Sequence, residues 1–137
     1  MDNDEIDIFA RTLYGEARGE GLLGIEAVAS VILNRVQLSR VCPVWWGKTV
    51  IEVCLKPLQF SCWNPDDKNF QKIMKVTEDD EVFCLCKRTA IRALNGFLKD
   101  ATNGATHYHN KNVNPAWARA LVPTYECGNH LFYREIP

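Results

Sequence analysis

The sequence lacks an excess of charge of either sign. Its 137 residues carry 16 Lys and Arg against 17 Asp and Glu, a formal net charge of -1 at pH 7. Proteins that bind nucleic acids in a general way neutralise phosphates with a basic excess or a basic stripe. We therefore expect no nucleic-acid partner. A polar substrate of neutral or mixed charge fits this composition better.

The sequence also lacks the segments that carry a protein into or across a membrane. No stretch approaches the roughly 20 apolar residues that a membrane span needs. The first five residues, MDNDE, are acidic, whereas a secretory signal begins with a basic segment and continues as an apolar run. These absences predict a chain without a membrane span, made in the cytoplasm without a visible signal peptide.

The cysteines are scattered, and most have apolar neighbours, as in Val53-Cys54-Leu55. Free buried thiols behave as small hydrophobic side chains, and the cytosol keeps thiols reduced. The alternative to a chain made in the reducing cytosol is a mature fragment of an exported protein. We predict reduced thiols rather than a disulfide framework for Cys42, Cys54, Cys62, Cys84, Cys86 and Cys127.

The residues that are present suit a globular protein with one core. Hydrophobic residues make up 47% of the chain and aromatic residues 10%, and neither internal repeats nor low-complexity segments occur. A chain of 137 residues has room for one core. We predict a single domain over residues 1–137, and we expect a monomer.

Helical periodicity dominates the first two thirds of the chain. Apolar residues recur at helical spacing in residues 4–17, 22–36 and 79–94. Shorter helical pieces are expected at 49–54, 70–74 and 117–121. The β-branched and aromatic segments 105–109 and 130–134 predict two strands that pair antiparallel. The predicted fold class is α+β, mostly helical, with a small antiparallel sheet near the C-terminus.

Glu16 is the first candidate for catalysis. It extends the apolar stripe of the first helix, which comprises Ile6, Phe9 and Leu13. A carboxyl group on an apolar stripe is partly desolvated, and desolvation raises its pKa as a general acid requires. The alternative is a structural ion pair with Arg18 or Arg35. Glu20 follows Gly19 and is expected to be solvated, outside the helix.

Two further groups of residues suggest chemistry. In residues 60–65, FSCWNP, an aromatic ring beside hydroxyl and amide groups suits a sugar, although Trp63 is equally explained as a core ring with its indole N–H satisfied. His107 and His109 share one face of the expected strand, and His130 approaches them if the two strands pair. Such a set, or two of these histidines with Cys127, would be a zinc site; a hydrogen-bonding surface is the alternative.

Five blocks together resemble the bacterial cell-wall hydrolases of the spore cortex-lytic (SleB and CwlJ) type. The blocks are ARTLYGEARGE at 10–20, GIEAVASVILNRV at 24–36, FSCW at 60–63, GATHYHN at 104–110 and GNHLFY at 128–133. They cover nearly the whole chain in order. One departure is FSCW, because the family usually reads FSW at that place.

The resemblance implies a lysozyme-like catalytic domain that cuts the glycan of peptidoglycan without a cofactor. It implies that Glu16 is the catalytic acid of lytic transglycosylation between N-acetylmuramic acid and N-acetylglucosamine, which leaves 1,6-anhydromuramic ends. On this reading the glycan groove is lined by Ser61, Trp63, Tyr108, Asn110 and Asn129. The site of action is then the cell wall, whether in the spore cortex, in the periplasm or in phage lysis.

Three alternatives stay open from the sequence. Ordinary glycan hydrolysis usually needs a second carboxylate, for which spacing selects none of Glu20, Glu26, Asp66, Asp67 and Asp100. A zinc amidase would use His107, His109 and His130. A peptidoglycan-binding module would keep the fold without turnover.

Overall fold

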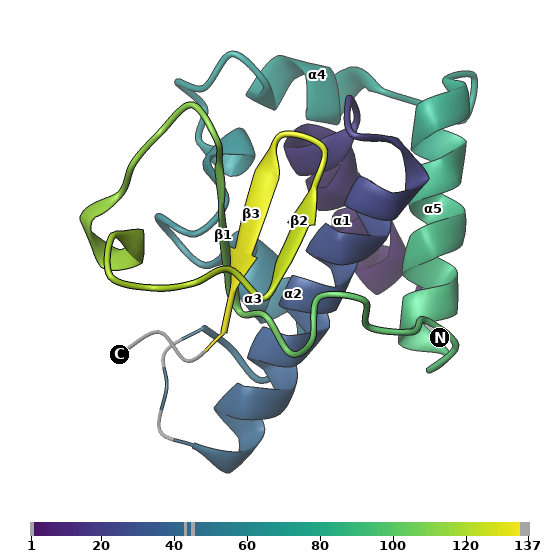
Figure 1. Ribbon diagram of the computed structural model, residues 1–137. Coiled ribbons are helices and arrows are strands. Elements are labelled where there is room, and N and C mark those ends of the chain that lie inside the picture. Colours follow the sequence, from purple (N-terminus) through teal and green to yellow (C-terminus); the bar gives the residue numbers. More distant parts are fainter. Residues whose placement is uncertain (1, 43, 45, 135–137) are drawn as a thin grey trace.

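The computed structural model describes residues 2–42, 44 and 46–134. Its five α-helices lie behind and beside a small sheet formed by the C-terminal part of the chain (Figure 1). The helices are α1 Asn3–Ala17, α2 Gly21–Val41, α3 Val50–Leu55, α4 Phe70–Lys75 and α5 Glu81–Leu94, and the single-turn helices are η1 Ser61–Trp63 and η2 Ala116–Ala118. The strands are β1 His107–Asn110, β2 Tyr125–Cys127 and β3 His130–Tyr133. The predicted mostly helical α+β class is confirmed.

Helix α1 is the hub of the helical layer. The Asp2 side chain caps it by accepting a hydrogen bond from the Asp4 N–H, and its apolar stripe is fully enclosed from Phe9 to Leu13. The helix contacts α2, α3, α4 and α5. Because α1 ends at Ala17, its last turn carries Glu16 to the junction where the helices meet the sheet.

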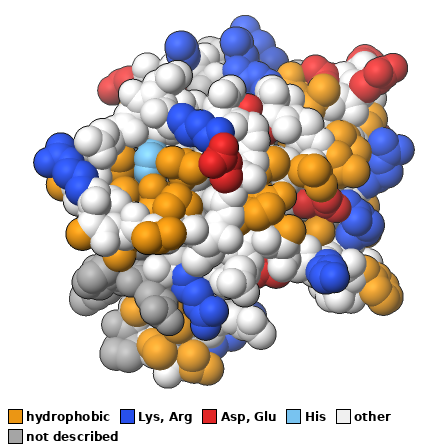
Figure 2. Space-filling view, viewed as in Figure 1, with side chains coloured by type: hydrophobic (Ala, Val, Ile, Leu, Met, Phe, Trp, Pro, Cys, Tyr) orange, Lys and Arg blue, Asp and Glu red, His pale blue; other side chains and the backbone are white. Residues whose placement is uncertain are grey.

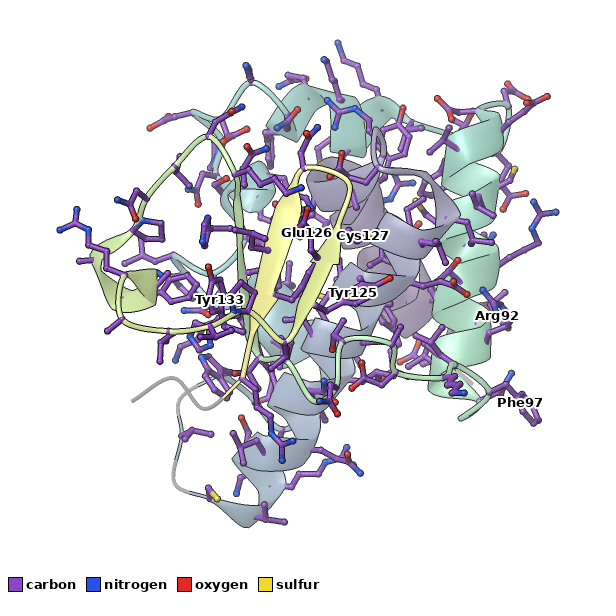
Figure 3. The ribbon with its side chains drawn as sticks, in the orientation of Figure 1. Arg92, Phe97, Tyr125, Glu126, Cys127 and Tyr133 are labelled. Atoms are coloured by element: carbon purple, nitrogen blue, oxygen red, sulfur yellow. The ribbon has the colours of Figure 1, made fainter. Side chains whose placement is uncertain are left out.

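Helix α2 is longer than the apolar period predicts, since it ends at Val41 rather than near residue 36. Its last turn is exposed on one side, so no buried stripe marks it in the sequence. By length and composition α2 resembles a membrane span, contrary to the expectation of no such stretch, yet more than half of its most apolar window is buried in the protein. Arg92 of α5, labelled in Figure 3, pairs with Glu26 of α2 at 2.8 Å and joins the two helices.

The sheet has the strand order β1-β3-β2, with both pairs antiparallel. The predicted pairing of β1 with β3 is confirmed, whereas β2 was not predicted because it spans only three residues. Gly128 joins β2 to β3 with a φ of +55°, in the left-handed region that glycine adopts readily. Directly paired residues share a face, so Tyr108, Asn110 and His130 lie on one face and His107 and His109 on the other.

Candidate active site

Glu16 lies in a partly buried position at the end of α1 and meets the sheet. Its Oε1 accepts a hydrogen bond of 2.5 Å from the Tyr108 hydroxyl of β1. Burial raises the pKa of the Glu16 carboxyl and the nearby Asp67 adds to this rise, while hydrogen bonds from Tyr108 and Cys62 and the charge of Arg35 act in the opposite direction. A carboxyl group that holds its proton to higher pH is suited to act as a general acid.

Gly15 permits the close approach of η1 to this end of α1. A Cβ atom at position 15 would lie 2.7 Å from the Cβ of Cys62, 2.8 Å from its Sγ and 2.9 Å from the Cγ2 of Ile73. Cys62 is fully buried, and burial raises the pKa of its thiol, so it remains protonated as a hydrogen-bond donor beside Glu16. The extra cysteine of the FSCW segment therefore contacts the candidate acid.

Arg35 places a buried positive charge behind Glu16 and Tyr108. Its guanidinium donates to the Thr106 carbonyl at 2.7 Å and to Gln59 Oε1 at 2.9 Å. Arg18 instead donates to Asn69 Oδ1 at 2.7 Å. Within the described part of the chain neither arginine forms an ion pair with Glu16, so the structural ion pair considered from the sequence is absent there.

Glu16 opens into a pocket of about 280 Å³ at the Asn110 end of β1. The pocket is polar on most sides and is lined by Gly15, Glu16, Arg18, Gly19, Glu20, Asn69, Asn110 and His130. Acidic and basic side chains are interspersed over the face of the molecule seen in Figure 2 rather than gathered into one basic stripe. The side chains that line the pocket include both hydrogen-bond donors and acceptors, which suits a sugar substrate.

The structure brings together some of the predicted groove residues and separates others. Tyr108 donates a hydrogen bond to Glu16, Asn110 lines the pocket, and Asn129 lies exposed beside the pocket. The indole N–H of Trp63 donates to Thr12 Oγ1 at 2.9 Å, and its ring packs against the core, away from the pocket lining. Ser61 is exposed and is not part of the lining.

The prediction that Glu20 is solvated is wrong. Only 12% of its side chain is exposed, and its Oε1 accepts a 3.0 Å hydrogen bond from the Asn129 N–H. The same oxygen lies 3.3 Å from Nδ1 of His130. Sequence spacing missed these contacts because they join residues more than 100 positions apart, as it missed the pair formed by Arg18 and Asn69.

The three histidines do not form the zinc site that the sequence left open. His130 pairs with Asn110 in the β1–β3 register, which places it on the face opposite His107 and His109. His107 packs between Trp46 and Trp117, and burial lowers its pKa to about 4. Cys127 lies opposite His130 in the register, and no group of three metal-binding side chains occurs within residues 2–42, 44 and 46–134.

Of the five candidate second carboxylates, only Glu20 shares the pocket with Glu16. Asp67 is close enough to influence the pKa of Glu16, and Asp66 is exposed. Glu26 is paired with Arg92, and Asp100 is held within the turn before β1 by Thr102, Gly104 and Asn34.

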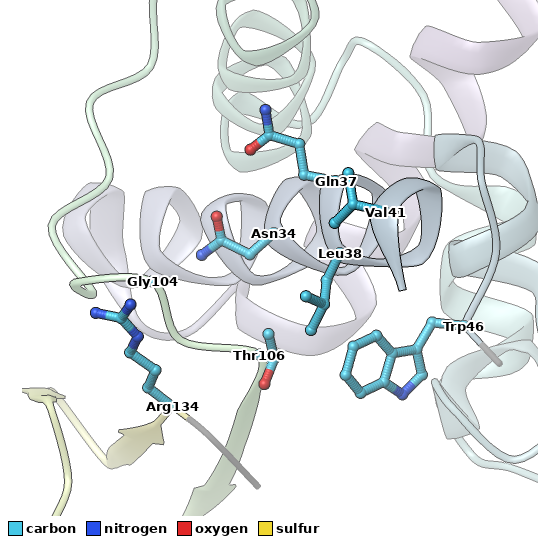
Figure 4. Close-up of a pocket in the computed structure, with 8 residues that line it drawn as sticks. All are labelled: Asn34, Gln37, Leu38, Val41, Trp46, Gly104, Thr106 and Arg134. Atoms are coloured by element: carbon cyan, nitrogen blue, oxygen red, sulfur yellow. The ribbon is translucent and has the colours of Figure 1, made fainter. Parts of the chain in front are cut away.

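A larger pocket of about 530 Å³ lies at the other end of β1 (Figure 4). It is lined by Asn34, Gln37, Leu38, Val41, Trp46, Gly104, Thr106 and Arg134. It contains no carboxyl, thiol or imidazole group among these lining residues. The pocket at Glu16 is therefore the better candidate for acid–base chemistry.

A family model described as Cell Wall Hydrolase matches residues 19–133. Glu16 lies just outside that range. Among curated proteins, the chain is 34% identical over 134 residues to a spore cortex-lytic enzyme of Halalkalibacterium halodurans, covering 96% of this chain and 34% of the relative. It is 29% identical over 136 residues to a spore cortex-lytic enzyme of Bacillus cereus, covering 94% of this chain and 44% of the relative. The chain thus spans less than half the length of these relatives.

Solved structures match the fold over almost its full length. The catalytic domain of the germination-specific lytic transglycosylase SleB from Bacillus anthracis superposes with a TM-score of 0.75 and 29% identity, covering 98% of this chain and 97% of that domain. The catalytic domain of the Bacillus cereus SleB protein gives a TM-score of 0.74 and 29% identity, with 97% and 91% covered. The chain belongs to the cell wall hydrolase family.

Proposed function

We propose that this chain cleaves the glycan strands of peptidoglycan between N-acetylmuramic acid and N-acetylglucosamine as a lytic transglycosylase. The observation that carries the proposal is Glu16, a carboxyl group with a raised pKa that is bonded to Tyr108 and opens into a polar pocket. The similarity to a domain named as a lytic transglycosylase over almost its whole length supports the same reaction.

In the proposed reaction Glu16 acts first as an acid and then as a base. Its carboxyl proton passes to the glycosidic oxygen as the bond from that oxygen to C1 of the muramyl ring breaks and positive charge develops at C1. The 6-hydroxyl oxygen of the same ring then bonds to C1, and its proton returns to the Glu16 carboxylate. The products are a free N-acetylglucosamine hydroxyl and a 1,6-anhydromuramic end, so one carboxyl group completes the cycle.

The other site residues receive proposed roles from where they lie. Tyr108 holds the Glu16 carboxyl in place, and Asn110 and Asn129 contact the sugar at the pocket and its rim. Ser61, exposed beside Cys62, contacts the glycan beyond the pocket. Trp63 supports the site from the core by its bond to Thr12.

The proposed place of action is the cell wall, in keeping with relatives that are named spore cortex-lytic enzymes. We propose that the catalytic unit acts as a monomer, because Glu16 and its pocket are built from one chain. Light scattering of the purified protein, with and without soluble glycan strands, tests this statement through the measured mass.

Replacing Glu16 with Gln tests the proposed function. The amide has the same shape but no acidic proton, so turnover of purified peptidoglycan should fall by about a hundredfold or more. Glu81→Gln, at an exposed site in the first turn of α5, is the matched control and should keep wild-type activity. Circular dichroism and thermal unfolding confirm that both variants fold. Full turnover by the Glu16→Gln protein would refute the assignment.

A further inference from the structure

The pocket contains a carboxylate–histidine pair that the reaction above does not use. Glu20 stands at the junction of α1 and α2, and His130 is the first residue of β3. Oε1 of Glu20 lies 3.3 Å from Nδ1 of His130, and both residues line the pocket together with Glu16. Their side chains are only 12% and 9% exposed, so this is a pair held within the protein.

The neighbouring chain is shaped to hold Glu20 in this position. Its Oε1 accepts the Asn129 N–H, and a Cβ atom at Gly128 would lie 3.0 Å from the same oxygen. Gly128 also has a φ of +55°, which side chains with a Cβ rarely adopt. The turn between β2 and β3 therefore leaves room for the Glu20 carboxylate and bonds to it.

The pair determines which nitrogen of His130 carries hydrogen. Burial lowers the pKa of His130, partly offset by Glu20 and reinforced by His109, so the ring is neutral near pH 7. A neutral imidazole has one N–H and one acceptor nitrogen. Nδ1 is buried and makes no hydrogen bond in this geometry, but Glu20 Oε1 lies 3.3 Å from it. A hydrogen on Nδ1 would have this carboxylate oxygen as its acceptor, and Nε2 would then be an acceptor itself.

Among the described residues no hydrogen bond to Nε2 of His130 is present, Nε2 is not one of the buried atoms without a partner, and His130 lines the pocket. The His130 ring packs edge-to-face with Tyr108, with the ring centroids 5.1 Å apart, and the Tyr108 hydroxyl donates a hydrogen bond to Glu16. Asn110, directly opposite His130 in the sheet, lines the same pocket. The His130 imidazole thus lies in the same pocket as the candidate acid and packs against the tyrosine that holds that acid.

We propose that Nε2 of His130 contacts the substrate by accepting a hydrogen bond from a sugar hydroxyl or N-acetyl N–H, and that Glu20 is the positioning residue that fixes its tautomer. This inference rests on the proposed function, because the ligand is the glycan bound beside Glu16. It adds His130 to Asn110 and Asn129 as a polar contact to the sugar.

Two substitutions separate this role from a structural one. His130→Asn keeps a donor near Nδ1 that faces Glu20 but removes the group at Nε2. His130→Gln places an amide near Nε2 and loses the contact with Glu20. Both are made in the Glu16→Gln protein, so that binding of soluble glycan strands freed of peptide stems is measured without turnover.

We expect the Asn variant to bind the glycan strands about tenfold more weakly than the Glu16→Gln parent, the loss of one hydrogen bond. The Gln variant should stay within about threefold of the parent. Wild-type binding by the Asn variant, a loss confined to the Gln variant, or equal losses in both would each overturn the role of Nε2.

The role of Glu20 has a spectroscopic test. Nitrogen-15 NMR of the histidine rings should show His130 as the Nδ1–H tautomer in the wild type and a decreased share of that tautomer in Glu20→Gln, whose amide can donate to Nδ1. An Nε2–H tautomer in the wild type would contradict the proposal. If the Glu16→Gln protein binds glycan strands but the wild type does not cleave them, the proposed function fails and the binding comparison can still be read.

Discussion

At the scale of single residues, the pKa of Glu16 is set by influences that act in opposite directions. Burial raises its pKa, whereas the Tyr108 and Cys62 hydrogen bonds and Arg35 lower it. Apolar spacing in the sequence placed Glu16 on the buried stripe of α1 correctly. The same spacing left Glu20 in solvent, because its partners lie in a hairpin at the other end of the chain.

Tyr108→Phe should move the pH dependence of activity in a defined direction. A general acid is active while protonated, so kcat/KM falls as pH rises through the pKa of Glu16. The Tyr108 hydroxyl lowers that pKa, and its loss should shift the alkaline limb of the profile to higher pH. Tyr133→Phe, whose hydroxyl contacts His109 on the other face of the sheet, should leave the limb in place. An alkaline limb that stays in place or moves to lower pH in Tyr108→Phe would contradict this account of Glu16.

Gly15→Ala should reverse the usual benefit of alanine in a helix. Alanine normally stabilises a helix interior by about 1 kcal/mol relative to glycine. Here the added Cβ would lie 2.7 Å from the Cβ of Cys62, so overpacking should reduce the free energy of unfolding by about 1–3 kcal/mol. Gly19→Ala has no heavy atom within 4 Å of its new Cβ and serves as the control. Denaturant unfolding compares them, and equal stability of the two variants would show that η1 does not need Gly15.

At the scale of secondary-structure elements, prediction succeeded where one face of an element is buried. The stripes of α1 and α5 and the apolar and aromatic run of β3 can be seen in the sequence. The last turn of α2 and the three-residue β2 could not be predicted, because exposed turns and short strands carry too few buried positions to set a period. The register of β1 with β3 determines which face of the sheet each histidine occupies, and the sequence alone does not define that register.

The turn at Asp100 lies in the connection between α5 and β1 and is hydrogen-bonded to Asn34 of α2. Its two carboxylate oxygens accept from the Thr102 N–H and hydroxyl, the Gly104 N–H and the Asn34 amide. Asp100→Ala should lower the free energy of unfolding by about 1–3 kcal/mol at neutral pH. Asp66→Ala, at an exposed aspartate, should have little effect.

The pH dependence of this loss follows from the sign of the pKa shift. The hydrogen bonds outweigh burial and lower the pKa of Asp100, so its contribution to stability is present above the ordinary aspartate pKa and is lost as pH falls through the lower, folded-state value. The difference between wild type and Asp100→Ala should therefore narrow in acid. A difference that stays constant down to about pH 2 would contradict the role of the carboxylate.

At the scale of the whole molecule, the fold brings the end of α1, the residue that precedes α4 and the sheet together around one pocket. The order of sequence blocks predicted the family, and the Cell Wall Hydrolase match and the SleB structures confirm it. The lining of the pocket was less predictable, because Trp63 turns toward Thr12 while Arg18, Asn69 and His130 enter from three separate elements. Function therefore depends on tertiary packing that no local pattern describes.

The most direct measurement is the identification of products by mass spectrometry after purified peptidoglycan is digested with the wild type and with Glu16→Gln. The wild type should release muropeptides with 1,6-anhydromuramic ends, and the variant should release almost none. Reducing muramic ends in place of anhydro ends would show hydrolysis, and intact glycan with freed peptide stems would show an amidase; either result would contradict transglycosylation by Glu16.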